Sequence, residues 1–189
     1  MNTTPTTKAE IRAIALKQRD QLTPEERTEK SRYICETLSE DDRFLDARGI
    51  HVYLPVQSEV DLKPLISLAW GMGKKVGLMR VQPDSGSHQF EITEDTEYMT
   101  GSRGIPEPVN AERFDMDQCD LVFVPLVAAD ENCNRIGYGK GYYDQFLTQN
   151  PRPTIGVAFD LQIFPSIPVD HLDITLDGIV TESRFITPS

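Results

Sequence analysis

Short apolar runs alternate with stretches of helical spacing along most of this sequence. The runs at residues 50–54, 76–81, 121–124 and 155–159 have the length of strands, and a shorter run lies at 178–180. Strands that alternate with helices favour a mostly parallel sheet with helices on both faces. We therefore predict an α/β fold, with the whole chain forming one domain.

Two helices are expected before the first strand. Thr7 with Glu10, and Thr23 with Glu26, each match a capping box, in which the two side chains satisfy backbone N–H groups at a helix start. A third helix is predicted over residues 61–72 from its apolar spacing. The mostly parallel sheet is thus expected to be preceded by two N-terminal helices.

Several polar loops should meet at one edge of this sheet. Ligands of open α/β sheets bind at the carboxyl ends of the strands. Residues 54–59, residues 126–141 and Asp160 all follow predicted strands there. Residues 87–93 alternate and predict an added edge strand, while the composition of residues 101–110 predicts a loop.

The most informative stretch is residues 120–147, DLVFVPLVAADENCNRIGYGKGYYDQFL. Pro125 ends its apolar strand because proline cannot donate to a sheet ladder. Gly137, Gly139 and Gly141 then occupy alternate positions before a stretch of helical spacing. Glycines ahead of a helix start allow backbone N–H groups to converge on an anion, and the positive end of the helix adds attraction. The pattern indicates a phosphate-binding loop.

Arg135 and Lys140 place two cations at this loop. The pattern is G-x-G-x-G, which differs from the dinucleotide fingerprint G-x-G-x-x-G. It also differs from the Walker pattern, because Gly141 follows Lys140 where Ser or Thr is needed. The loop by itself leaves two interpretations open: a phosphate site, or a glycine-rich surface loop with a solvated lysine.

Composition narrows the class of function. The chain has 19 basic and 30 acidic residues and a net charge of −11, which argues against a nucleic-acid partner. The three cysteines and three histidines are isolated in sequence, so neither a disulfide framework nor a His/Cys metal site is expected. We find no signal-peptide pattern and no apolar run of membrane-spanning length, and we expect a cytoplasmic protein without a membrane partner.

The string RIGYGKGYYD at residues 135–144, after the strand DLVFVP, resembles the signature of the 5-formyltetrahydrofolate cyclo-ligase (5,10-methenyltetrahydrofolate synthetase) family. The resemblance extends over nearly all of residues 1–189, in the family's order. The outer segments that carry it are the K-x-x-x-R of Lys8 and Arg12, the strand and E-V-D at 53–55 and 59–61, the G-I-x-E-P loop at 104–108, and Gln162, Pro168, Asp173 and 177–182.

This resemblance implies a fold shared with phosphosugar isomerases and CoA transferases. It also implies an ATP-dependent reaction, in which 5-formyltetrahydrofolate closes to 5,10-methenyltetrahydrofolate and ADP and phosphate are released. ATP is then a co-substrate, Mg²⁺ accompanies it, and the partners are small molecules. Phosphoryl transfer depends mainly on positioning and charge stabilisation, which suits cations and glycine N–H groups. The sequence leaves the oligomeric state open, and a monomer is compatible with it.

The resemblance also implies roles for individual residues. It places the catalytic groups at Arg135, Lys140 and Tyr142, and the magnesium ligands at Asp144 and Asp173. It places the folate contacts at Leu54, Glu59, Tyr138 and Tyr142. The nucleotide contacts are Lys8, Arg12, Arg135, Ile136, Gly137, Tyr138, Gly139, Lys140, Gly141, Tyr142 and Tyr143.

Two departures and two rival functions accompany the resemblance. Arg103 stands near a position where some members carry Trp, which puts an aromatic contact with the substrate in doubt. Ala129 stands where Phe is frequent, and we interpret this as a packing difference. One rival is an ATP-independent phosphosugar isomerase or CoA transferase that uses Glu59 or Glu107. The other is a non-catalytic folate- or nucleotide-binding module.

Overall fold

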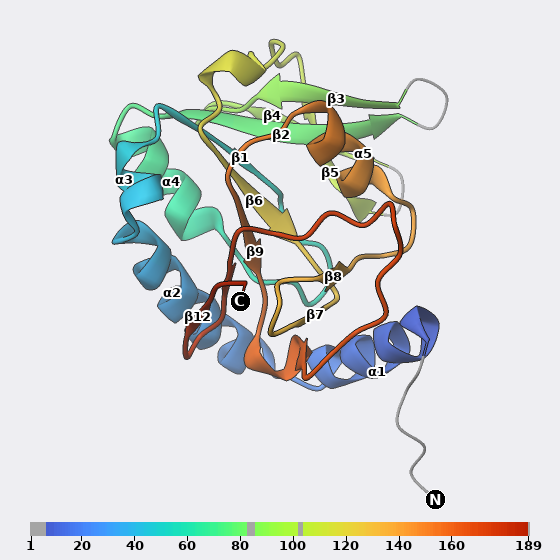
Figure 1. Cartoon of the computed structure of the whole chain (residues 1–189). Coiled ribbons are helices and arrows are strands. Elements are labelled where there is room, and N and C mark those ends of the chain that lie inside the picture. The colour runs from blue at the N-terminus through green and yellow to red at the C-terminus, as the bar shows by residue number, and fades with distance from the viewer. Residues whose placement is uncertain (1–6, 83–85, 102–103, 189) are drawn as a thin grey trace, which may run out of the picture.

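The computed structural model describes residues 7–82, 86–101 and 104–188, and a large sheet forms its centre (Figure 1). Within these residues the sheet has seven strands in the order β12-β11-β9-β6-β1-β2-β3. The five inner strands are parallel, and the edge strands β3 and β12 are antiparallel. The predicted large, mostly parallel sheet is confirmed. Its strands are β1 (Gly49–Val52), β2 (Lys75–Gln82), β3 (Gly86–Glu91), β6 (Leu121–Pro125), β9 (Thr154–Val157), β11 (Ile179–Val180) and β12 (Phe185–Ile186).

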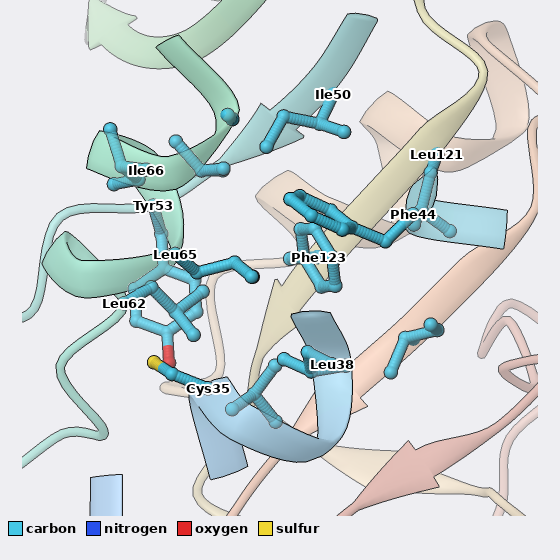
Figure 2. Close-up of a cluster of buried hydrophobic side chains, with 14 of the residues drawn as sticks. Cys35, Leu38, Phe44, Ile50, Tyr53, Leu62, Leu65, Ile66, Leu121 and Phe123 are labelled. Atoms are coloured by element: carbon cyan, nitrogen blue, oxygen red, sulfur yellow. The ribbon is translucent and has the colours of Figure 1, made fainter. Parts of the chain in front are cut away.

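Helices cover both faces of the sheet because its central strands are apolar on both sides. Along β6, Leu121 and Phe123 face one layer, and Val122 and Val124 face the other. Figure 2 shows the first layer, where Phe44 lies against Phe123 with ring centroids 6.5 Å apart. The helices of this layer are α2 (Pro24–Ser39), α3 (Asp42–Asp46) and α4 (Lys63–Gly71).

The opposite layer contains α5 (Tyr142–Gln149), which begins directly after Gly141 as predicted. Phe146 and Leu147 of α5 are buried against this face. Ala129 is fully buried in the same cluster, in agreement with its interpretation as a packing residue.

α1 (Lys8–Asp20) packs on a smaller, three-stranded sheet rather than on the main one. Ile11 and Ala15 of α1 are buried against Val127, Ala128 and Ile136. The capping box predicted at the start of α1 forms, as does the one at the start of α2. The smaller sheet consists of β7 (Ala128–Asp130), β8 (Arg135–Ile136) and β10 (Ile163–Phe164), with the 3₁₀ turn η3 (Asp160–Gln162) beside it.

The prediction of a loop over residues 101–110 was wrong in part. β4 (Glu97–Thr100) and β5 (Pro106–Val109) pair antiparallel in a separate two-stranded sheet. Pro106 and Pro108 suggested a loop because proline lacks an N–H group. They lie two residues apart, so their nitrogens face the same side, and an edge strand tolerates proline when that side is unpaired. The strands β7, β8, β10 and β12 were also missed, because each is only two or three residues long.

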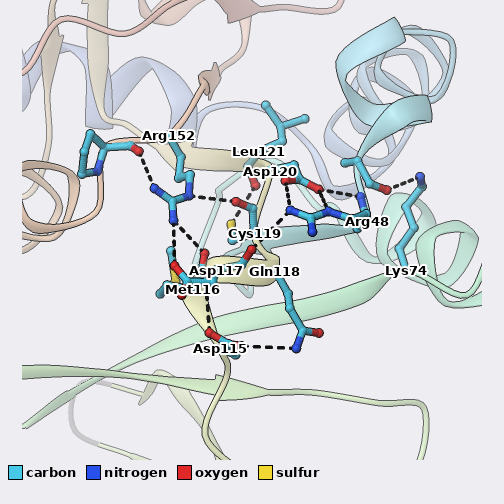
Figure 3. Close-up of polar contacts among 12 residues, drawn as sticks. Arg48, Lys74, Asp115, Met116, Asp117, Gln118, Cys119, Asp120, Leu121 and Arg152 are labelled. Carbon is cyan, nitrogen blue, oxygen red and sulfur yellow. Dashed lines mark hydrogen bonds and ion pairs between the residues drawn. The ribbon is translucent and has the colours of Figure 1, made fainter.

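The amino ends of the central strands are joined by a polar network (Figure 3). Arg48 binds the Asp120 carboxylate through Nε at 3.0 Å and through a terminal nitrogen at 2.8 Å. Arg152 donates to the carbonyl groups of Cys119 and Met116 at 3.0 and 3.1 Å. This network fixes the segment between η2 (Met116–Gln118) and β6.

The three cysteines are free and buried within the layers described above. Over the described residues, the structure contains no helix of the length and apolar character that crossing a bilayer requires.

Candidate functional site

The candidate site lies at the carboxyl edge of the parallel sheet. The segment after β6 runs into β7, β8 and the residues 137–141, which we call the glycine loop. Gln162, after β9, donates to the carbonyl groups of Leu126 and Val127 at 3.0 and 2.9 Å and so ties two of these segments together. Side-chain hydrogen bonds described below join the 53–61 segment, after β1, to the same edge. The predicted gathering of loops is therefore confirmed.

The glycine loop connects β8 to the start of α5. Gly139 and Gly141 have φ angles of +80° and +68°, in the left-handed region that favours glycine. Gly141 is the N-cap of α5 and provides no side-chain hydrogen bond to the first turn. The helix start therefore has backbone N–H groups without a side-chain cap, which is the arrangement that binds anions.

Arg12 reaches the glycine loop from α1. Its Nε donates to the carbonyl oxygen of Gly137 at 2.8 Å. A Cβ added at Gly139 would lie 3.1 Å from a terminal nitrogen of Arg12. The guanidinium thus lies against the loop, and its contact with a nucleotide stays a prediction.

The predicted catalytic residues differ in how far they are already engaged. Lys140 is exposed, and its side chain has no hydrogen bond or ion pair among the described residues. Tyr142 is half-buried in the first turn of α5. Arg135 is 5% exposed and donates to Asp144 Oδ1 at 2.9 Å, while its Nε is buried without a partner. Lys140 is the residue most available to a ligand.

The two predicted magnesium ligands lie in neighbouring segments. Asp144 Oδ1 also accepts from the N–H of Ile174, at 3.3 Å, next to Asp173 in sequence. Asp173 accepts from the N–H of Asp170 at 2.7 Å and from Lys8. Burial raises the pKa of the Asp173 carboxyl, but these hydrogen bonds outweigh it and hold the pKa below its ordinary value.

Lys8 lies against these acids rather than against the glycine loop. Its Nζ binds Asp173 and also Asp170, the latter at 2.6 Å. The structure therefore brings Lys8 together with one predicted magnesium ligand. Its contact with the nucleotide stays a prediction.

The predicted folate residue Glu59 is 8% exposed and bonded through both oxygens. Oε2 accepts from the N–H of Val56 at 3.0 Å, and Oε1 accepts from the Tyr138 hydroxyl at 2.9 Å. Burial raises the pKa of the Glu59 carboxyl, opposed by the Val56 N–H group, the Arg19 charge and the Tyr138 hydroxyl. Leu54 lies in the same segment, half-buried against the core.

The remaining predicted residues take different places. Ile136 is 2% exposed in the cluster under α1, so only its backbone can meet a nucleotide. Tyr143 packs edge-on against Phe146 with ring centroids 6.1 Å apart. Glu107, considered for the rival functions, forms an ion pair with Arg80 at 2.8 Å. Arg103 lies outside the described residues.

Sequence reasoning missed Arg19 and Ser58. Arg19 is 1% exposed and donates to Ser58 Oγ at 3.0 Å and to the Tyr138 hydroxyl at 2.8 Å. A signal for Arg19 was present, because it follows Ile11 and Ala15 at intervals of four and so lies on the buried face of α1. A cation on an apolar stripe marks a residue that needs buried partners.

Comparisons with known proteins identify the family of this chain. The model of the 5-formyltetrahydrofolate cyclo-ligase family matches residues 4–182. The 5-formyltetrahydrofolate cyclo-ligase of Escherichia coli K12 is 31% identical over 171 residues, covering 86% of this chain and 93% of that protein. The mouse enzyme of the same name is 30% identical over 176 residues, covering 85% and 86%.

A solved structure gives the same result. The NMR structure of Aquifex aeolicus 5,10-methenyltetrahydrofolate synthetase superposes with a TM-score of 0.85 and 33% identity, covering 95% of this chain and 92% of that one. The match to the family model includes the glycine loop, α1 and the segment that contains Glu59. This chain belongs to the 5-formyltetrahydrofolate cyclo-ligase family.

Proposed function

We propose that this chain catalyses the ATP-dependent cyclisation of 5-formyltetrahydrofolate to 5,10-methenyltetrahydrofolate, with release of ADP and phosphate. One observation carries the proposal: Tyr138 of the glycine loop donates to Glu59 while Arg12 donates to Gly137 of the same loop. The predicted nucleotide and folate residues therefore adjoin, as transfer of a phosphoryl group between two ligands requires.

The chemistry explains the charges at this edge. A formamide oxygen is a poor leaving group, so the formyl oxygen first takes the γ-phosphoryl group of ATP. N10 of the folate then attacks the formyl carbon and loses its proton, the C–O bond to the phosphoryl group breaks, and phosphate leaves. Charge develops on the migrating phosphoryl oxygens, and preorganised cations stabilise it most effectively.

Each site residue has a place in this scheme. Lys140 and the glycine-loop N–H groups stabilise the migrating phosphoryl group, and Tyr142 lies beside them at the helix start. Arg135 contributes positive charge from β8 and forms an ion pair with Asp144. Leu54, Glu59, Tyr138 and Tyr142 bind the folate. The nucleotide is held by Lys8, Arg12, Arg135, Ile136, Gly137, Tyr138, Gly139, Lys140, Gly141, Tyr142 and Tyr143.

Asp144 and Asp173 suit Mg²⁺ as a donor set. They come from neighbouring segments, and Mg²⁺ commonly takes one or two carboxylates and completes its shell with waters and phosphate oxygens. The ion would neutralise charge on the β- and γ-phosphates. Lys8 forms an ion pair with Asp173 in this structure. We infer that the Lys8 side chain turns toward the nucleotide when the ion binds.

Four features of the whole protein complete the proposal. The chain acts as a single domain over residues 1–189. Its fold is of the phosphosugar isomerase and CoA transferase type. It works as a cytoplasmic enzyme on small molecules, without nucleic acid or membrane. A monomer suffices, because every proposed site residue comes from one chain.

The test is to mix purified protein, MgATP and 5-formyltetrahydrofolate and to follow the near-ultraviolet absorbance of the methenyl product. Product is expected only when ATP is present. Turnover of a sugar phosphate or a CoA thioester without ATP would support the isomerase or transferase alternative. Nucleotide binding without product would support a non-catalytic module.

A further inference from the structure

Arg19 is the most deeply buried charge at the candidate site, and the proposed function gives it no role. It lies at the end of α1, and only 1% of it is exposed. Its NH1 nitrogen is buried without a partner among the residues described. A buried N–H group without an acceptor is costly. Burial of Arg19 is therefore unfavourable for stability, and the two hydrogen bonds that it does make need another explanation.

Those contacts determine where two hydroxyl protons point. A guanidinium only donates, so any hydroxyl that accepts from it must direct its own proton elsewhere. Tyr138 accepts from Arg19 at 2.8 Å and donates to Glu59 at 2.9 Å. Ser58 accepts from Arg19 at 3.0 Å and donates to Asp20. Arg19 thus fixes the Tyr138 proton on the Glu59 carboxylate.

Tyr138 connects the two halves of the site. Its backbone lies between Gly137 and Gly139 in the glycine loop, and its hydroxyl is bonded to Glu59 in the segment after β1. Glycines on either side make the loop conformationally permissive. A phosphate that orders the loop therefore also determines the position of the Tyr138 ring.

We propose that Arg19 is a positioning residue that makes nucleotide and folate binding cooperative, by holding the Tyr138 hydroxyl on the Glu59 carboxylate. The inference rests on the proposed function. Arg19 acts through Tyr138. When a nucleotide orders the glycine loop, Tyr138 and Glu59 are held in one geometry, and the folate then binds without the cost of ordering them.

The charge of Arg19 serves the same purpose. Burial raises the pKa of the Glu59 carboxyl, and the nearby guanidinium opposes that shift and favours the ionised form. An ionised carboxylate accepts hydrogen bonds from the N–H groups of a pterin. The other titratable groups that face Glu59 are Tyr53, Tyr138, Tyr143 and, behind Ser58, Asp20. The three tyrosines are neutral at neutral pH, and burial raises their pKa values further above the ordinary value of 10.0.

The test measures cooperativity directly. Calorimetry gives the Kd of 5-formyltetrahydrofolate with and without a saturating non-hydrolysable ATP analogue and Mg²⁺. The wild type is expected to bind folate at least about fivefold more tightly with the analogue, the lower end of usual coupling. Arg19→Met and Tyr138→Phe should each bring this ratio close to one.

The matched control is Lys17→Met, which removes an exposed cation from the same helix. It should keep the wild-type ratio. Tyr138→Phe removes only a hydroxyl, so it decides the question if Arg19→Met does not fold. A wild-type ratio in Tyr138→Phe, or in a folded Arg19→Met, overturns the proposal, as does a wild-type ratio near one.

A pH series provides a second readout. If the role of Arg19 were purely structural, Arg19→Met would not shift the pH dependence of folate binding. Folate binding should weaken as Glu59 takes up a proton on acidification. In Arg19→Met this loss should begin at a higher pH than in the wild type, and an unshifted profile contradicts the proposal. Wild-type turnover with ATP is measured alongside. Its absence would overturn the proposed function, whereas normal turnover with unchanged coupling would overturn only the role of Arg19.

Discussion

The two ends of the parallel strands both carry arginines, but these arginines are used in opposite ways. At the amino end, Arg48 and Arg152 bind two carboxylates, those of Asp120 and Asp117, and several carbonyl groups of a single segment. At the carboxyl end, Arg19 and Arg135 are almost fully buried, and each keeps a nitrogen without a partner among the residues described.

The arginines at the carboxyl end are more deeply buried than stability alone would favour. Arg48 has 69% of its side chain exposed, where an ion pair costs little and contributes little. Arg135 has 4% exposed, where desolvation is expensive and every unused donor adds to the cost. The amino end is therefore a completed network that joins segments. The carboxyl end keeps bonding capacity that a ligand can use.

The sharpest way to test this contrast is Lys140→Ala. Lys140 is exposed and unbonded within the described structure, so its loss should leave the melting temperature unchanged. The turnover rate should fall by about 100-fold or more, as for the loss of one preorganised donor at a developing charge. Lys63→Ala, which also removes an exposed lysine, is the control. A wild-type kcat in Lys140→Ala would make Lys140 an ordinary surface residue.

A comparison of one arginine from each end is the second test. Arg12→Met removes the guanidinium that binds the Gly137 carbonyl group, and we expect the KM for ATP to rise by about tenfold or more. Arg48→Met removes an arginine from the amino end and should leave that KM unchanged. Steady-state kinetics with ATP as the varied substrate measures both. Equal effects of the two variants would remove the distinction between the ends.

Asp173 and Asp170 allow a smaller but well-matched test of the magnesium site. Both accept from Lys8, but only Asp173 is a predicted metal ligand. Asp173→Asn should raise the Mg²⁺ concentration for half-maximal rate by several-fold, because Mg²⁺ depends strongly on carboxylate ligands. Asp170→Asn should not. If both variants shift the Mg²⁺ requirement alike, the effect belongs to Lys8.

The smallest expected effect concerns stability alone. The Arg48 side chain holds the pKa of Asp120 at about 2, below its ordinary value of 3.8. A depressed pKa adds stability that is present above the unfolded value and is lost as the pH falls through the folded one. Asp120→Asn should therefore cost at most about 1 kcal/mol at neutral pH. The cost should vanish between about pH 4 and pH 2, with kcat unchanged.

Glu59 should show the opposite sign. Burial raises the pKa of its carboxyl, so the folded state binds a proton more tightly than the unfolded chain does. Stability contributed by this group falls as the pH rises from the unfolded pKa through the folded one. Urea unfolding of Glu59→Gln and Asp120→Asn across a pH series would show the two trends. Parallel trends would contradict the contrast between the ends.

The sequence was sufficient for the parts of the molecule that local patterns determine. Central strands such as β6 are apolar on both faces, and the capping boxes at Thr7 and Thr23 depend on residues three apart, so both were predictable. The glycine pattern located the start of α5. The prolines of β5 concealed a strand, since the side on which their nitrogens face depends on a partner that is distant in sequence.

Much of the site could not be predicted, because it depends on contacts between distant segments. Arg19 and Tyr138 are 119 positions apart, and Tyr138 and Glu59 are 79 apart. No local pattern specifies that these groups meet. Lys8 was expected at the nucleotide and is bonded to Asp170 and Asp173, a choice among nearby charges that only the fold reveals.

The packing of α1 has a consequence for how the enzyme can lose activity on heating. α1 contacts the smaller sheet and η3 and is buried there through Ile11 and Ala15, outside the layers on either face of the main sheet. Local opening of such an element requires less free energy than global unfolding. A molecule with α1 undocked lacks Arg12 at the glycine loop and Arg19 at Tyr138. With the roles proposed for Arg12 and Arg19, the apparent affinity for both ligands should scale with the docked population and decline before the main sheet melts.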